Sequence, residues 1–205
     1  MSSFITRGLP CRAAAFLPVL LVSLALSGCA ALGTPPASAL KLARMSPMEA
    51  DPGAIRFALA TPSYLRLREG DITVTVRYDT GDPETSFLEQ YKPIITDETA
   101  SAPGLPPHAG SARLVVARFD QADSEAFRAM QARVKAYKAA GGNGKGSLTV
   151  GATGCRTAPV PAGPIRMSAW LRAEADEPYF ALMRDVDMRR TLEKAGADTG
   201  LIPQC

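Results

Sequence analysis

The chain has 205 residues, of which 23 are Lys or Arg and 20 are Asp or Glu, giving a formal net charge of +3. This near balance gives no argument for nucleic acid as a partner, because proteins that bind it carry a strong basic excess. The length suits one folded domain with a hydrophobic core of its own.

Residues 1–28 have the three-part pattern of a secretory signal. A short basic stretch with Arg7 and Arg12 precedes an apolar run over 13–26, and small residues follow. The apolar run is shorter than the roughly 20 residues that a membrane-spanning helix needs. We therefore expect this segment to be removed.

The segment Leu26-Ser27-Gly28-Cys29 resembles the lipobox of bacterial lipoproteins. The resemblance covers only this N-terminal region. It implies cleavage after Gly28 and acyl chains, palmitate among them, on Cys29, which would anchor the chain to a membrane of the cell envelope. Ala30 follows in place of an Asp, which in this family indicates the outer membrane, facing the periplasm. The alternative is an ordinary secreted protein with a chance cysteine here.

Cleavage would leave 177 residues, with 21 basic and 20 acidic side chains. Residues 29–38 have no apolar periodicity and contain two adjacent prolines, which predicts a flexible tether. Residues 39–205 are expected to form a single globular domain.

Two cysteines, Cys155 and Cys205, would remain for a structural role in an oxidising compartment. The expected pairing is a Cys155–Cys205 disulfide that ties down the C-terminus. The alternative is two free thiols. A closed zinc site is disfavoured, because two cysteines and one histidine do not complete a tetrahedral ligand set.

Alternating or apolar runs predict strands at 40–45, 55–59, 72–78, 87–95 with a break at Pro93, 114–119, 148–152, 165–171 and 179–183. One long helix is predicted over about 120–140 by an apolar stripe of Phe127, Met130, Val134 and Tyr137. A short helix is expected in the tail. The fold class is α+β, mainly β: an antiparallel sandwich-like sheet of about seven or eight strands with the long helix packed on it.

Three features of the sequence are candidates for a catalytic or binding site: a glycine-rich run, a single histidine and a group of acidic residues. The glycine-rich run 141–147 follows a helix and precedes a strand, the reverse of a phosphate loop, so we interpret it as a flexible connector. His108 lies in a Pro-rich loop without a nucleophile motif beside it. The third group is acidic and is made up of Glu174, Asp176, Glu177, Asp185 and Asp187.

No catalytic set, metal site or cofactor is expected from these patterns. The leading interpretation is a lipid-anchored, non-enzymatic module that binds or braces an envelope protein partner, with no nucleic acid involved. One alternative is an envelope hydrolase that uses carboxylates near 174–187. Another is a lipoprotein that holds a small apolar ligand between sheet and helix.

Overall fold

The computed structural model describes residues 35–45, 48–99, 104, 105, 112–194, 196, 200 and 202–205. The expected signal, Cys29 and His108 lie outside these residues. In chain order the elements are α1 (Pro36–Arg44), β1 (Arg56–Pro62), β2 (Leu65–Arg66), β3 (Ile72–Asp79), β4 (Phe87–Tyr91), β5 (Ile94–Thr99), β6 (Ala112–Arg118), α2 (Gln121–Ala139), β7 (Lys145–Ala152), β8 (Cys155–Arg156), β9 (Arg166–Arg172), β10 (Phe180–Asp187) and α3 (Met188–Lys194).

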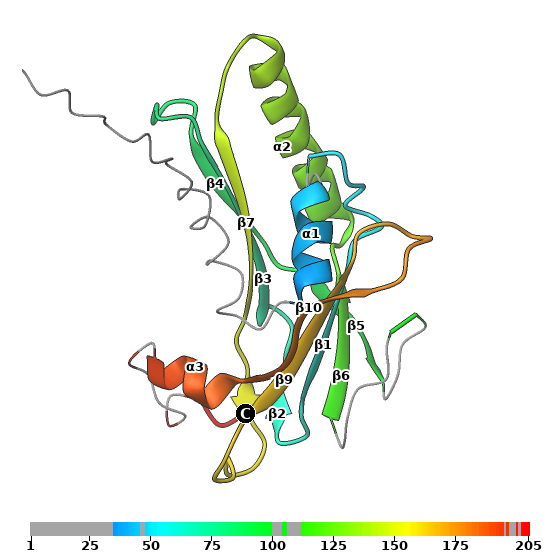
Figure 1. Cartoon of the computed structure of the whole chain (residues 1–205), viewed down its shortest axis with the longest axis vertical. Coiled ribbons are helices and arrows are strands. Elements are labelled where there is room, and N and C mark those ends of the chain that lie inside the picture. Colours follow the sequence, from blue (N-terminus) through cyan, green and yellow to red (C-terminus); the bar gives the residue numbers. More distant parts are fainter. Residues whose placement is uncertain are drawn as a thin grey trace, which may run out of the picture.

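The strands form antiparallel sheets (Figure 1). Five of them make one sheet in the order β10-β9-β1-β6-β5, three make a second sheet in the order β4-β3-β7, and β2 pairs with β8. The expectation of a mainly β, α+β chain with antiparallel sheets is confirmed. The strand count matches only in part, because the described part of the chain has ten strands and three helices.

One hydrophobic core joins the two larger sheets and α2. It includes Phe57 from β1, Val115 from β6, Val74 from β3 and Phe127 from α2, each at most 3% exposed. Strand β3 shows how the sequence builds this core, because its side chains are buried at every second position. The cleanest alternation in the sequence therefore marks the central strand of the smaller sheet.

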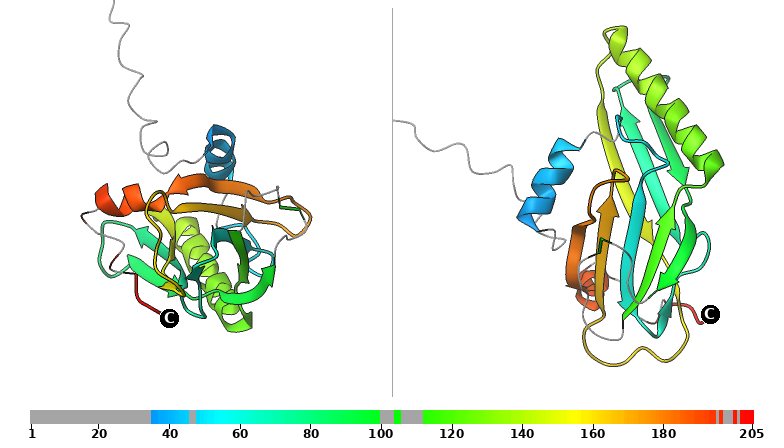
Figure 2. Two further views of the ribbon diagram at one scale, coloured as in Figure 1. Left: turned by 90° about the horizontal axis from the view of Figure 1, so that it is seen from below. Right: turned by 90° about the vertical axis from the view of Figure 1, so that its right-hand side faces the viewer.

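Helix α2 confirms the long helix expected at about 120–140. Its first turn is capped by Asp120, whose Oδ1 accepts a hydrogen bond from the Asp123 backbone N–H at 2.7 Å. Phe127, Met130 and Val134 are buried on one stripe. In the right-hand view of Figure 2 the helix runs along the smaller sheet at one end of the molecule, where Tyr137 contacts the ring of Tyr78 on β3 and Phe127 contacts that of Tyr91 on β4.

Three local expectations differ from the structure. Residues 36–44 form α1, which replaces the strand expected at 40–45 and takes in residues 36–38 of the expected tether. The break expected at Pro93 in the strand 87–95 is found, but the two parts, β4 and β5, belong to different sheets, and β5 continues to Thr99. Residues 145–147 of the glycine-rich run are part of β7 and not of a connector.

Helix α1 lies beside β10 (Figure 2) and is held there by contacts from the far end of the chain. Its Lys41 Nζ lies 2.6 Å from Glu177 Oε2 and 4.8 Å from the centre of the Phe180 ring. Pro36 occupies the start of the helix, where a missing N–H has no consequence. A segment of nine residues is marginal as an isolated helix, so these distant contacts decide its conformation.

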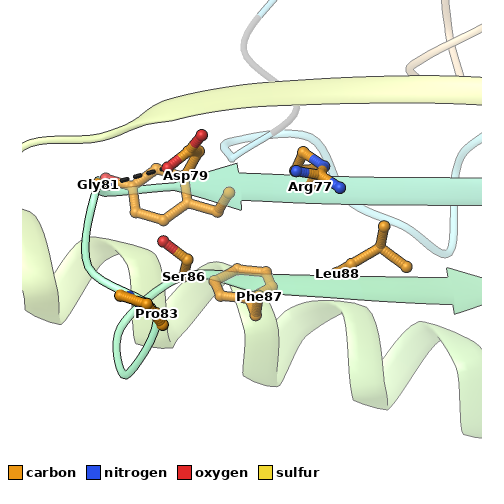
Figure 3. A pocket seen from close by; sticks show the side chains of 8 residues that line it. Arg77, Asp79, Gly81, Pro83, Ser86, Phe87 and Leu88 are labelled. Atoms are coloured by element: carbon orange, nitrogen blue, oxygen red, sulfur yellow. Dashed lines mark hydrogen bonds between the residues drawn. The ribbon is translucent and has the colours of Figure 1, made fainter.

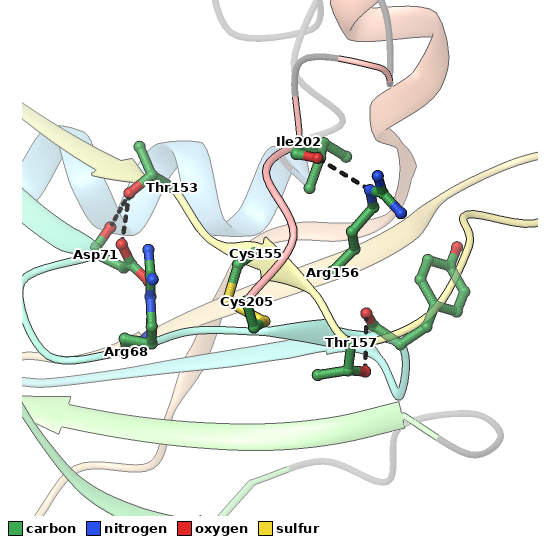
Figure 4. The surroundings of a disulfide bond; sticks show 9 residues. Arg68, Asp71, Thr153, Cys155, Arg156, Thr157, Ile202 and Cys205 are labelled. Carbon is green, nitrogen blue, oxygen red and sulfur yellow. Dashed lines mark hydrogen bonds and ion pairs between the residues drawn. A yellow bond between two sulfur atoms is a disulfide. The ribbon is translucent and has the colours of Figure 1, made fainter.

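The C-terminal tail is fastened to β8 (Figure 4). Cys155 and Cys205 form the expected disulfide, with a Cα–Cα distance of 4.9 Å. Arg156 adds backbone hydrogen bonds on both sides, donating to Pro203 O at 2.8 Å and accepting from the Cys205 N–H at 3.1 Å. The last residues are therefore an integral part of the domain.

Candidate functional site

The carboxylates at the end of β10 are engaged by neighbouring groups. Asp185 Oδ2 lies 3.3 Å from Arg166 Nη1, and Asp187 Oδ1 accepts the backbone N–H groups of Ile165 and Arg189, each at 3.1 Å. These contacts fix the start of β9 and of α3. The two acids expected for a hydrolase therefore have structural partners and are not poised as an acid–base pair.

No group of three His, Cys, Asp or Glu side chains among the described residues is arranged to hold a metal ion. No helix among them is long and apolar enough to cross a membrane.

Basic residues on α2 are paired as well. Arg128 Nη2 lies 2.8 Å from Asp51 Oδ1, and Lys135 Nζ lies 2.9 Å from Glu49 Oε2. Arg133 binds Glu89 on β4 in the same way. Three of the four basic residues of this helix are therefore paired with carboxylates of the fold.

A shallow hollow of about 300 Å³ lies at the β3–β4 turn (Figure 3). Asp79 on its rim accepts the Gly81 backbone N–H at 2.9 Å, so this carboxylate stabilises the turn. The hollow is at the end of the smaller sheet rather than between sheet and helix, where a small apolar ligand was considered. Its lining residues are Arg77, Tyr78, Asp79, Gly81, Pro83, Ser86, Phe87 and Leu88.

Three arginines, in contrast, lie side by side across the larger sheet. Arg56 on β1 is directly opposite Arg118 on β6 and directly opposite Arg172 on β9. Neighbouring side chains in such pairs have Cβ atoms about 5 Å apart, and like charges placed there destabilise a sheet. We call these three residues the arginine row.

The partners of the arginine row do not neutralise it. Arg56 Nη1 donates to the carbonyl oxygens of Gly53 and Ile55, both at 2.8 Å, and Arg118 Nη1 donates to Phe119 O at 3.2 Å. The ion pairs within the described part of the chain involve other basic residues. Three positive charges therefore lie together, and no carboxylate of the described residues is paired with any of them.

Of the three arginines in the row, Arg172 has the fewest hydrogen-bond partners among the described residues. Its guanidinium carbon lies 5.2 Å from the centre of the Tyr179 ring. Its Nε is buried and has no hydrogen-bond partner among the described residues. A buried N–H left in this state costs about 1–3 kcal/mol, so a native protein is expected to keep it only for a reason.

Electrostatic repulsion within the arginine row affects the pKa of Arg56, its central member. Burial lowers the pKa of the Arg56 guanidinium below its usual value, and the charges of Arg172 and Arg118 lower it further. Asp51 has the smallest effect on this pKa and raises it. An arginine stays protonated at neutral pH even so, and the row remains a concentrated positive charge.

The arginine row borders a second apolar cluster on the outer face of the larger sheet, the face turned away from the smaller sheet. Trp170 and Tyr179 contribute the large side chains and are 3% and 8% exposed. Small residues, among them Ala58 and Ala181, fill the space between them. The arginine row is therefore held at the edge of a buried apolar cluster on this face of the sheet.

Guanidinium groups in this arrangement are suited to bind oxyanions. Each offers planar donors that match a carboxylate or phosphate, and Arg loses less hydration than Lys on binding. Three of them on adjacent strands extend over about 10 Å. The row therefore suits several anionic groups along a chain better than a single small ion.

The sequence contains no local signal for this site. Arg56, Arg118 and Arg172 each stand at the end of a strand, where a charged residue is ordinary. They meet only because β1 lies between β6 and β9.

The chain was compared with family models, curated proteins and solved structures, and nothing matches in any of the three. The site must therefore be judged by its own chemistry.

Proposed function

We propose that this protein is a lipid-anchored, non-enzymatic module of the cell envelope that uses the arginine row to bind an acidic segment of an envelope protein. Two parts of the proposal have separate support. The anchor is supported by the lipobox-like segment that ends at Cys29. The binding role is supported by one observation, the three arginines abreast without a carboxylate partner among the described residues.

The acidic segment is favoured by the shape of the site. Carboxylates on one face of an extended chain recur every second residue, about 6.6 Å apart, and several would meet the row as the segment crosses β6, β1 and β9. A free phosphate ion would reach one or two of the guanidiniums only.

A direct test uses the full-length lipid-bearing chain in detergent micelles and a fluorescent hexaglutamate peptide, followed by anisotropy. Arg56→Gln removes the central charge and is expected to weaken binding at least tenfold, since a hydrogen bond to a charged group contributes about 1.5–3 kcal/mol. Arg77→Gln is the matched control, because Arg77 is an exposed strand arginine opposite Ser147 and Leu88. Equal losses of peptide affinity in the two variants would show that binding depends only on the net charge of the protein.

Two further measurements separate the parts of the proposal. Inorganic phosphate that displaces the peptide at equal concentration would assign the row to phosphate and refute the acidic-segment assignment. Cys29→Ala is expected to move the protein from the membrane fraction to the soluble envelope fraction, with peptide binding unchanged. Retention of the Cys29→Ala protein in the membrane would refute the anchor without affecting the arginine row.

A further inference from the structure

The edges of the two larger sheets differ in how they are protected from another strand. Strand β10 has two register shifts and a left-handed residue, Asp185, and α1 lies beside it. Strand β5 has a register shift in its pairing with β6. Strand β4 has five residues, and its Glu89 is bound by Arg133 of α2. Register shifts, charges and covering helices are the devices that keep sheet edges from pairing.

Beyond Lys145 at its start, strand β7 has none of these devices within the described part of the chain. It pairs with β3 over eight consecutive positions without a register shift. Residues 146–152 contain no charged residue and no proline. Its other side is not paired with any strand of the described chain. A long, regular and neutral edge of this kind is a template for another strand.

The pairing of β7 with β3 determines which backbone N–H and C=O groups of β7 point toward its free edge. The Thr153 backbone N–H donates to Asp71 O at 2.8 Å, one position beyond the strand and in the same register. Because hydrogen-bonded and non-hydrogen-bonded positions alternate in an antiparallel pair, N–H and C=O groups point outward at Gly146, Leu148 and Val150, and then at Ala152. The free edge therefore has donors and acceptors along its whole length.

We propose that two copies of this chain pair antiparallel through β7, about a two-fold axis at Thr149, so that their smaller sheets join into one six-stranded sheet. This register overlaps residues 146–152 of both copies completely. It places Gly146 opposite Ala152, and Leu148 opposite Val150, of the second copy. Leu148 and Val150 are half-buried against the core of their own copy, and pairing covers more of their apolar surface.

Charge also favours a second copy over other occupants. In this register Lys145 lies opposite Thr153 of the second copy, whose Oγ1 is bonded to Asp71 Oδ1 at 3.0 Å. The ammonium group of each copy thus approaches a carboxylate of the other, and no like charges face each other. The strand is therefore self-complementary in hydrogen bonding and charge.

A cysteine at the two-fold axis tests the register in the full-length chain in its own membrane. Thr149 would face its own copy in a non-hydrogen-bonded pair, with Cα atoms about 4.5 Å apart, a distance that allows a disulfide. We expect Thr149→Cys to form a disulfide-linked dimer on mild oxidation. Ser147→Cys is the matched control on the same strand face, and its two copies would be about 13 Å apart. Equal linking in both variants, or monomer in both, would overturn the proposal.

A charge at the same position tests the dimer without a covalent bond. The measurement is the mass of the full-length protein in detergent by light scattering over a range of concentrations. Thr149→Lys places like charges opposite each other and is expected to raise the dimer dissociation constant at least tenfold. Thr75→Lys puts the same charge on the neighbouring middle strand and should leave the dimer intact. A monomeric wild-type protein, or crosslinking of β7 to a different protein, would overturn the proposal.

Discussion

Replacing Arg172 by Met should stabilise the protein while weakening its binding of an acidic peptide. Removing an arginine that holds a fold together lowers the free energy of unfolding of the protein. Arg172 is different, because it lies opposite Arg56 and keeps a buried Nε without a partner. Methionine retains most of the apolar stem and has neither the charge nor the N–H group.

The size of the gain follows from three contributions. Relief of one like-charge pair contributes about 0.5 kcal/mol. Removal of the unsatisfied Nε contributes about 1 kcal/mol, the lower end of the usual range, because Arg172 is only half-buried. Loss of the cation–π contact with Tyr179 costs about 0.5–1 kcal/mol. The free energy of unfolding should therefore rise by about 0.5–1 kcal/mol.

Equilibrium unfolding in urea is the assay, with the full-length chain in detergent. Trp170 is the only tryptophan and is buried in β9, so its fluorescence reports on the larger sheet. The gain should shrink as salt screens the repulsion. Arg77→Met, without an arginine opposite, should change stability little. A loss of more than 1 kcal/mol in Arg172→Met would refute the idea that the arginine row is strained.

Three further predictions concern the fold. Replacing both Cys155 and Cys205 by Ser should lower the free energy of unfolding by up to about 4 kcal/mol, because the bond closes a loop with a sequence separation of 50; urea midpoints with and without reductant would show it. Burial, helped by the hydrogen bond to Glu89, raises the pKa of Tyr91 above the value of about 10 that a tyrosine has in the unfolded chain. The stabilisation that protonated Tyr91 gives the folded state is therefore complete below about pH 10 and is lost as the pH rises above that value. Tyr91→Phe should flatten an alkaline unfolding curve, and an unchanged curve would count against this assignment. Asp120→Ala should cost about 1 kcal/mol in thermal unfolding, through the N-cap of α2.

Local patterns predict the elements whose stability is decided locally. The alternation in β3 and the apolar stripe with its cap in α2 are found as expected, because burial on one face sets both periods. Helix α1 is the contrary case. Its position depends on Lys41 meeting Glu177 and Phe180, which are distant in sequence, and the proline pair at its start also suits an extended tether.

The candidate surfaces depend on sheet order, which a single sequence does not reveal. Arg118 and Arg172 are each an unremarkable strand end until β1 brings Arg56 between them. The edge of β7 is likewise visible only once β3 is known to pair with β4 on its other side. The acidic residues near 174–187 attracted attention in the sequence because they are clustered, yet Asp185 and Asp187 have structural partners.

Within the described part of the chain, the arginine row and the β7 edge both depart from the usual rules of sheet design. One sets like charges side by side, and the other leaves a regular strand unpaired. Both departures cost stability or risk association, and each would be relieved by the occupant that we propose for it. The row is on the outer face of the larger sheet and β7 is the edge of the smaller one, so a second copy at β7 leaves both rows open. A dimer would then offer two rows to one long acidic segment, which raises affinity without any new contact.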